Sequence, residues 1–280
     1  FKPQTEWTPP TEFPDLSKHN EIAIDLETKD PDLIKMGSGS VTQRGEVVGI
    51  AVAVKGWKGY FPIGHEGGGN MDKRMVLKWF QAVLNTDADK IFHNAMYDVC
   101  WIKSLGLTLQ GKIIDTMIAS ALVDENQMRY DLTSCARRYT GQGKDEAALY
   151  EAAKSWGVDA KAEMYKLPAM YVGDYAEKDA EITLELWQEL KKEIIHQDIS
   201  SIFNLETELF PCLVDMRFLG VRVDVEGAHI LKQQLVAQEK ELLQKIKTET
   251  QVDVQIWAAR SIEKVFQKLS LPYDRTEKTN

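Results

Sequence analysis

The residues most able to do chemistry in this chain are carboxylates that fall into short patterns. Asp25 and Glu27 lie two residues apart in the run EIAIDLET, which alternates apolar and polar side chains. Because successive side chains of a β-strand point to opposite faces, both carboxylates leave the same face. The opposite face is apolar and is expected to pack into a core (Ile22, Ile24 and Leu26). The pattern predicts a strand with two acidic groups on its polar face.

Two further patterns add acidic groups from later parts of the chain. Asp98 ends the run HNAMYD, after Asn94 and Tyr97, where a strand is expected to pass into a helix. Tyr175 and Asp179 lie four residues apart in a long helical pattern, which places both on one side of the helix. Carboxylates from three separate elements are therefore expected to converge.

Four carboxylates in one place suit hard divalent cations, which take oxygen ligands from Asp and Glu together with substrate phosphate. Two such ions about 4 Å apart activate a water and stabilise the leaving oxygen of a phosphodiester. Each pattern also has a plain alternative: Asp-x-Glu recurs at Asp179/Glu181 and Asp224/Glu226, and a solvated polar face accounts for most such pairs. Asp25 nevertheless lies in the most hydrophobic strand, where an unpaired carboxylate is costly.

The composition is ordinary for a globular protein in water. Of the 280 residues, 44% are hydrophobic and 28% are charged, and the formal net charge is −9. No run approaches the roughly 18 apolar residues of a membrane span, and no signal peptide opens the chain. The three cysteines are widely spaced and favour neither a disulfide framework nor a zinc cluster, so a reducing, cytosolic setting is expected. The acidic balance argues against bulk electrostatic binding to nucleic acid.

Hydrophobic periodicity divides the chain into a mixed block and a helical tail. The first twenty residues carry four prolines and predict an extended arm or linker. Strands are expected at 21–28, 46–55, 57–63 and 89–94, with helices at 71–85 and 95–106. Later segments are expected to be helical: 113–123, 130–141, two short helices within 145–166, 169–196, 199–220 with a kink or break at Pro211, 226–250 and 259–273. The composition shifts near 198–210, which suggests a domain boundary.

The three acidic patterns, in this order and on these elements, resemble the DEDD superfamily of 3′→5′ exonucleases, in the branch with Tyr in its last motif. The matching residues are Asp25 and Glu27, then Asn94, Tyr97 and Asp98, then Tyr175 and Asp179. More closely, the chain resembles the proofreading exonuclease segment of a family A DNA polymerase of the bacteriophage kind. IIDTMIASALVDEN, LTSCARRYTG and YAEKDAEITLELW carry this likeness, and LFPCLVDMRFLGVRVDVEGA resembles the join to the polymerase domain.

The resemblance implies an α/β, ribonuclease-H-like fold with a mixed sheet flanked by helices, followed by an all-helical fragment. It implies an arm over 1–20, an exonuclease domain over 21–197 and the incomplete start of a polymerase domain over 198–280. The motifs that carry nucleotide addition in that family have no counterpart here. No polymerase active site is therefore expected in this chain.

The resemblance also assigns roles to the site residues. Two divalent cations, Mg²⁺ or Mn²⁺, would be held by four carboxylates (Asp25, Glu27, Asp98 and Asp179). Tyr175 would orient the attacking water, while one ion activates it and the other stabilises the departing 3′ oxygen. Four further positions would contact the substrate: Leu26, Thr28, Asn94 and Tyr97. For Leu26 and Thr28, a core leucine and a strand-end threonine are equally good interpretations, and for Asn94 a helix cap is an alternative.

The implied substrate is the 3′ end of single-stranded DNA or a frayed primer-template, because a paired terminus must melt to enter a narrow site. The implied partners are this DNA and the remainder of a polymerase chain, with no membrane, in the cytoplasm, or the host cytoplasm for a bacteriophage protein. Two rivals stay open: an RNA 3′-exonuclease of the same superfamily, and a catalytically silent scaffold that binds primer-template or a partner protein.

Other polar residues have structural interpretations. His93 is expected to be a structural histidine and Asp115 a helix cap. Several basic residues could contact phosphates, but a solvated face is the favoured interpretation for each: Arg137, Arg138, Lys144, Lys154, Lys161 and Lys166. DNA binding would then be local, through ions and a small positive groove, which is compatible with the net charge of −9.

Overall fold

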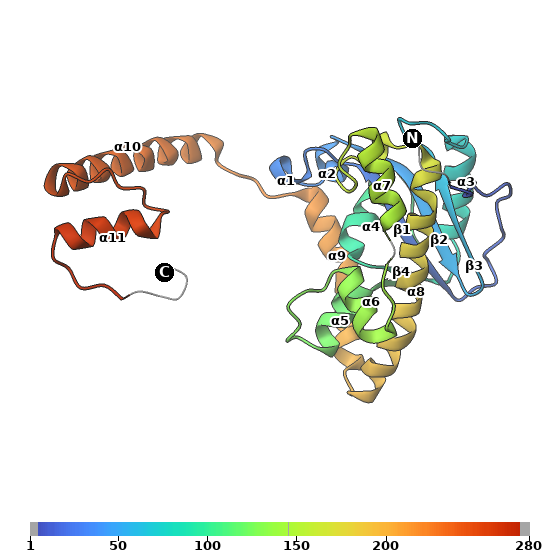
Figure 1. The fold of residues 1–280 in the computed structure, drawn as a ribbon. Coiled ribbons are helices and arrows are strands. Elements are labelled where there is room, and N and C mark those ends of the chain that lie inside the picture. The colour runs from blue at the N-terminus through green and yellow to red at the C-terminus, as the bar shows by residue number, and fades with distance from the viewer. Residues whose placement is uncertain (1–4, 145, 275–280) are drawn as a thin grey trace. The chain divides into compact units, whose positions relative to one another are not determined.

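A five-stranded mixed sheet lies at the centre of residues 5–219 in the computed structural model, which describes residues 5–144 and 146–274 (Figure 1). The strand order is β3-β2-β1-β4-β5. The strands are β1 (Glu21–Lys29), β2 (Glu46–Val54), β3 (Trp57–Pro62), β4 (Asp89–Phe92) and β5 (Ile113–Asp115). β1, β2 and β3 pair antiparallel, whereas β4 is parallel to β1 and β5 is parallel to β4. The predicted α/β class with a mixed sheet is confirmed.

The central strand β1 contributes to two separate cores. Ile22, Ile24 and Leu26 are buried in the core on one face, and Ala23 is buried in the core on the other. The alternation predicted from the sequence is therefore confirmed. The pairing of β1 with β2 shifts between Glu27 and Thr28, which is a β-bulge next to the acidic residues.

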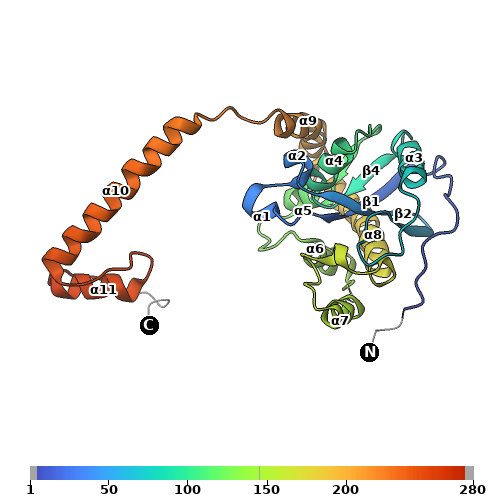
Figure 2. The same cartoon turned by 90° about the horizontal axis from the view of Figure 1, so that it is seen from above.

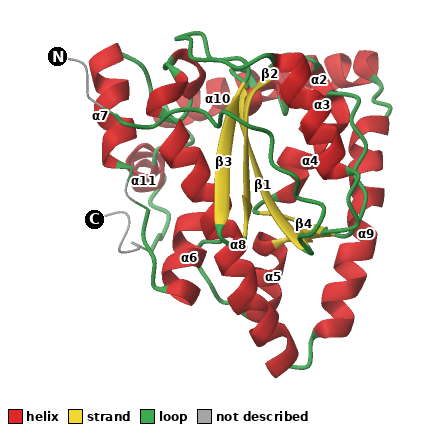
Figure 3. Cartoon of the chain, turned by 90° about the vertical axis from the view of Figure 1, so that its right-hand side faces the viewer, coloured by secondary structure: helices red, strands yellow, loops and turns green. Residues whose placement is uncertain are grey.

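Helices cover both faces of the sheet (Figure 3). On one face α8 (Gly173–His196) contacts four strands, and α5 (Thr116–Val123) and α6 (Leu132–Thr140) pack against α8. On the other face lie α3 (Lys73–Leu84) and α4 (Ala95–Ser104), with α9 (Ser200–Leu219) beside α4 and β5. The other elements up to residue 219 are α1 (Leu33–Met36), α2 (Gly39–Thr42), α7 (Ala147–Trp156) and 3₁₀ turns at Met164–Lys166 and Ala169–Tyr171.

Two predicted elements differ from the structure. The run 113–123 was expected to be one helix, but its first three residues form β5 and the helix begins at Thr116. Three residues are too few to show a strand period, so only the pairing with β4 reveals the strand. Of the kink or break expected at Pro211, the break does not occur, because α9 continues through this proline as one helix. Packing of Phe210 and Val214 in the core holds the helix on both sides of it.

The N-terminal arm packs on the domain. Trp7 lies in the α8-side core, donates its indole N–H to Glu177 at 2.8 Å, and occupies the space where a Cβ at Gly173 would be. On the other face Phe13 stacks on Phe61 with ring centroids 5.8 Å apart, and Leu16 is buried. Residues 5–20 are thus extended and bound to both cores; residues 1–4 lie outside the described part.

The chain divides into two compact units, Phe1–Leu219 and Gly220–Asn280. The boundary between these compact units comes after α9, later in the chain than the domain boundary expected at 197/198. The expected domain boundary stays a prediction. The second unit contains α10 (Val225–Thr250) and α11 (Ala259–Lys268), visible in Figure 2. Within residues 220–274 only Thr250 and Val265 are buried, so these helices have little core of their own. Among the described residues, no helix combines the length and apolar character needed to cross a membrane.

The packing of α9 predicts a stability difference along one helix. Phe210 is buried in the α3-side core, whereas Met216 is exposed. Phe210→Ala should lower the free energy of unfolding of the first unit by about 3–5 kcal/mol through lost burial and a cavity. Met216→Ala should change it by less than about 0.5 kcal/mol. Urea denaturation followed by circular dichroism measures both, and similar losses for the two variants would contradict the role of α9.

Candidate active site

The candidate site lies between β1 and α8. Asp25 and Glu27 leave β1 on the face that α8 covers, because they alternate with Ile24 and Leu26 of the opposite core. Asp179 is buried on α8, and Tyr175 lies one turn before it. The strand period and the helix period thus bring the first and third patterns together.

Asp98 is connected to β1 through the backbone. It is buried in the first turn of α4, and its Oδ1 accepts the N–H of Leu26 at 2.9 Å. Leu26 lies between the two acidic residues of β1, so this hydrogen bond holds the second pattern against the first. Leu26 itself is only 5% exposed, and its side chain lies in the core.

The carboxylates raise one another's pKa. Burial, and then the negative charge of Asp179, raise the pKa of Asp25 to about 7. Burial raises the pKa of Glu27 well above its usual range, with Asp25 and Asp179 adding to the shift. The pKa of Asp98 is also raised well above its usual range, by burial and by Asp25. Ionising several carboxylates so close together is costly, and a bound cation would offset this cost.

Tyr60 on β3 borders the same site. Glu27 pairs with Gly49 on β2, and a Cβ at Gly49 would lie 1.9 Å from the Tyr60 hydroxyl. The missing side chain at Gly49 gives this tyrosine its space. The Tyr60 hydroxyl bonds to His65 Nε2 at 2.6 Å, and His65 Nδ1 bonds to the Leu167 carbonyl at 3.0 Å. These bonds connect β3 to the segment that leads into Tyr175.

Two lysines reach the site from the segment around α7. Lys144 Nζ lies 2.6 Å from Asp179 Oδ1, and the two side chains are only 8% and 6% exposed. The solvated face predicted for Lys144 is therefore wrong. Lys161 Nζ donates to the Tyr175 hydroxyl at 3.0 Å and pairs with Glu146 at 2.7 Å. Lys161 is 44% exposed, but it is not merely solvated either. Neither contact has a local sequence signal, since both depend on how the segment folds back over α8.

Of the positions expected to contact substrate, Thr28 and Tyr97 have side chains in contact, and Asn94 stands at the start of α4. The Thr28 and Tyr97 hydroxyls lie 2.7 Å apart, and Tyr97 donates to Asp30 Oδ2 at 3.1 Å. Burial raises the pKa of Tyr97 to about 12, so it stays protonated. Asn94 is the residue before α4, with a left-handed φ of 66° and no side-chain capping bond. Thr28 and Tyr97 thus lie together at the bulged end of β1.

The residues around His93 are structural. His93 bonds to the Thr116 hydroxyl and to the Tyr130 carbonyl, both at 2.8 Å, and burial lowers its pKa to about 4. The expectation of a structural histidine is confirmed. Asp115 caps α5 through the Met117 N–H, as expected, and also accepts the N–H groups of Asn94 and Ala95. One carboxylate therefore holds the starts of two helices.

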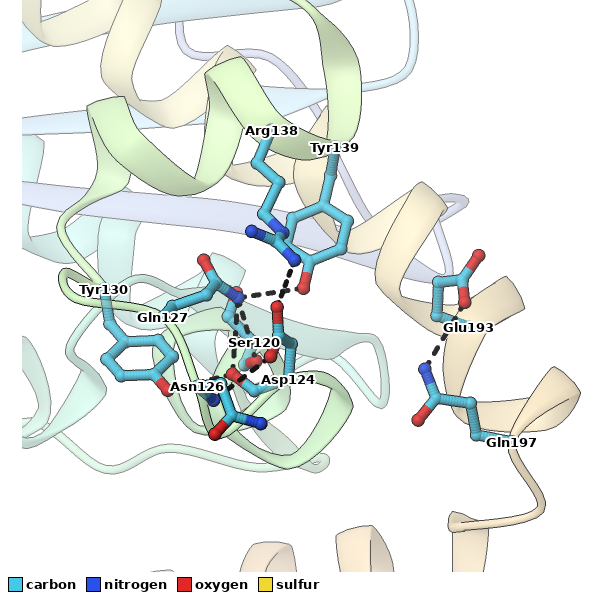
Figure 4. A network of polar contacts seen from close by, with 9 residues as sticks. All are labelled: Ser120, Asp124, Asn126, Gln127, Tyr130, Arg138, Tyr139, Glu193 and Gln197. Carbon is cyan, nitrogen blue, oxygen red and sulfur yellow. Dashed lines mark hydrogen bonds and ion pairs between the residues drawn. The ribbon is translucent and has the colours of Figure 1, made fainter.

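The loop that receives His93 has its own polar network (Figure 4). Tyr130 donates its hydroxyl to the Asp124 carbonyl at 2.8 Å, and Arg138 forms an ion pair with the Asp124 side chain. Gln127 donates to the Tyr139 hydroxyl at 3.0 Å. These bonds fix residues 124–130 against α6, and through the Tyr130 carbonyl they hold the neutral imidazole beside the site.

Known proteins resemble this chain in sequence and in fold. A family model described as 3′-5′ exonuclease matches residues 11–195, more than half of the chain. The chain belongs to this exonuclease family. The matched range includes all five residues proposed from the sequence as catalytic: Asp25, Glu27, Asp98, Tyr175 and Asp179.

Relatives of this exonuclease chain are polymerases of phages and bacteria. It is 34% identical over 253 residues to a DNA-directed DNA polymerase of Pseudomonas phage M6, covering 88% of this chain and 38% of the relative. It is 29% identical over 231 residues to DNA polymerase I of Pseudomonas aeruginosa, covering 79% of this chain and 24% of the relative. The exonuclease domain identified here is thus of the kind found in family A DNA polymerases, and the chain spans well under half of these relatives.

Solved structures confirm the predicted ribonuclease-H-like exonuclease fold. The POL domain of Pol1 from M. smegmatis, in complex with DNA primer-template and dNTP, has a TM-score of 0.63 at 17% identity, covering 94% of this chain and 40% of that one. Brucella melitensis NrnC with bound Mg²⁺ has a TM-score of 0.52 at 18% identity, covering 75% of this chain and 92% of that one. At these identities the likeness concerns the fold of the exonuclease.

The buried His93 predicts how stability depends on pH. The pKa of His93 is about 4 when the exonuclease is folded and 6.5 for the free group, so the unfolded chain binds the extra proton between these values. Stability is therefore lost as pH falls through this window, by about 2 kcal/mol between pH 7 and pH 5. His93→Gln is unable to bind that proton. The difference in unfolding free energy between wild type and variant should therefore be smaller at pH 5 than at pH 7 by this amount. Denaturant unfolding at each pH measures the gap, and a constant gap would refute the prediction.

Proposed function

We propose that this domain hydrolyses the terminal phosphodiester of single-stranded or frayed DNA 3′ ends with two divalent cations, Mg²⁺ or Mn²⁺. The observation that carries the proposal is the meeting of four carboxylates from β1, α4 and α8 at the family's motif positions, with the pKa of each raised by burial.

The donor set fits hard divalent cations. Asp25, Glu27, Asp98 and Asp179 offer only carboxylate oxygens, and the positive charge nearest Asp179 is the amine of Lys144, which stands where a cation is needed. Such ions, when bound, supply an activated water and stabilise the leaving oxygen. Among the described residues, no three acidic, histidine or cysteine side chains already lie in metal-binding geometry, so these carboxylates would have to move when the cations bind.

Tyr175 would position the attacking water. Its hydroxyl accepts a hydrogen bond from Lys161 and hydrogen-bonds to the Asp179 carboxylate, so a cation on Asp179 would free the O–H to donate to the water. Its pKa is raised well above the usual range by burial and by Asp179, which keeps the hydroxyl protonated and able to donate. Thr28 and Tyr97, at the bulged end of β1, would contact the terminal nucleotide, and so would Asn94 at the start of α4 and Leu26, whose side chain is mostly buried.

The DNA substrate and the polymerase partner rest on the relatives. The phage M6 relative is a DNA-directed DNA polymerase, and the M. smegmatis structure contains DNA primer-template. We infer that this domain proofreads for the remainder of a polymerase chain, in the cytoplasm of a cell or of a phage's host. The helical part from 198 onward would belong to the start of the polymerase domain, with α9 packed on the exonuclease within the first compact unit.

An RNA 3′-exonuclease is the second candidate. It is favoured by the fold likeness to Brucella melitensis NrnC, one structure of which is bound to pGG, at a TM-score of 0.51 and 18% identity. The polymerase relatives speak against it. A silent scaffold is disfavoured, because burying four carboxylates without using them is costly.

The first test is digestion of labelled strands. The chain should shorten 5′-labelled single-stranded DNA from its 3′ end with Mg²⁺ or Mn²⁺, and chelator should stop it, because the carboxylates need cations to act. A matched RNA strand should be digested more slowly. Shortening that persists in chelator, or that starts at the 5′ end, would overturn the proposal; faster digestion of RNA would favour the second candidate.

The second test separates the carboxylates from the tyrosine. Asp25→Ala, Asp98→Ala and Asp179→Ala should each abolish cleavage, because each removes an anionic ligand. Tyr175→Phe deletes one hydroxyl and should cost about 10²-fold in rate. Glu189→Gln, on an outer face of the same helix, should cleave at the wild-type rate. Single-turnover rates on one oligonucleotide decide it, and a folded Asp179→Ala with normal cleavage would remove α8 from the site.

A further inference from the structure

We propose that Lys144 is a tethered cation that occupies Asp179 in the metal-free site and must leave before a divalent ion binds that carboxylate. Its ammonium would thus compete with the metal. This inference rests on the proposed function, because it assumes that Asp179 is a metal ligand.

The burial of the pair is the first support. Lys144 Nζ lies 2.6 Å from Asp179 Oδ1, with side chains 8% and 6% exposed. Lysine is almost never this buried unless it is paired, and removing one partner leaves an uncompensated charge. The two groups therefore stabilise each other as long as no other cation is present.

The direction of the contact is the second support. Lys144 contacts an oxygen of the proposed metal set itself, and its ammonium lies 5.5 Å from the Tyr175 ring centroid. Lys161 is its natural comparison, because it approaches the same tyrosine to 4.2 Å from the ring centroid but pairs with Glu146. Both charges oppose the rise in pKa of Asp25 and Glu27, yet only Lys144 takes a ligand position.

The backbone just before Lys144 borders open space. Gly141 and Gly143 precede it, and a Cβ at either glycine would meet no atom within 4 Å. α7, which follows, is held by Leu149, Ala152 and Ala153 in the buried interior. A divalent ion would repel the ammonium and offer Asp179 twice its charge, so the lysine would swing out while α7 stays in place.

The main experiment is calorimetric titration of Mn²⁺ into the full chain. Lys144→Met keeps the length of the side chain and removes the competing charge, so it should bind Mn²⁺ about tenfold tighter or more, which is about 1.4 kcal/mol. Lys161→Met removes a nearby charge without freeing a ligand and should tighten binding much less. Lys166→Met, whose partner is Glu163, should leave the affinity unchanged.

Three results would overturn the inference. Lys144→Met with unchanged or weaker affinity would show that the lysine is no competitor. If Lys161→Met tightened Mn²⁺ binding as much as Lys144→Met, the effect of Lys144 would be only that of a nearby positive charge. If neither wild type nor Lys144→Met bound Mn²⁺, the proposed function would fail and this inference with it, whereas binding by wild type without a change in the variant would overturn this inference alone.

A second measurement uses only the wild-type chain and does not depend on how a variant folds. An amine-reactive reagent followed by mass spectrometry reports how accessible each lysine is. Lys144 should be protected without metal and should become reactive as Mn²⁺ is added. Lys166 and Lys178 are controls, and the reactivity of each should not change with Mn²⁺. Lys144 that is reactive without metal, or still protected at saturating Mn²⁺, would overturn the inference.

Discussion

The structure depends on keeping four carboxylates close together in a buried place. Like charges at short range resist ionisation, and here burial and mutual repulsion raise the pKa of Asp25, Glu27 and Asp98 together. The arrangement is held by groups that are not themselves acidic. The Leu26 N–H fixes Asp98, Lys144 balances Asp179, and packing of α8 on the sheet sets the distance between the strand and the helix.

β1 carries the acidic site residues on one face and core residues on the other. β1 is the third of five strands, so it pairs with a strand on each edge, and both of its faces are buried in cores that include helices. Its odd-numbered acidic residues face α8, while Ile22, Ile24 and Leu26 fill the other core. A shift of one residue would exchange the two sets, so the core packing fixes the register on which the site depends.

Much of this could be predicted from the sequence, because the signals were local. Strand alternation identified the face of Asp25 and Glu27, and helical spacing paired Tyr175 with Asp179. What escaped prediction was decided by distant parts of the chain. β5 is defined by its neighbour β4, α9 continues through Pro211 with core contacts on both sides of it, and Lys144 reaches Asp179 across 35 positions of sequence. Neither periodicity nor composition carries information about such contacts.

The place of α9 has a consequence for how such domains are exchanged between genes. The family match ends at residue 195, yet Phe203 lies in one core of the sheet and Phe210 and Val214 in the other. A recombination at the edge of sequence similarity would leave both cores incomplete, whereas one near Gly220 would transfer a unit that brings its own last helix. Inheritance of this exonuclease should therefore follow the boundary of its packed unit, about two dozen residues beyond the point where the family match ends.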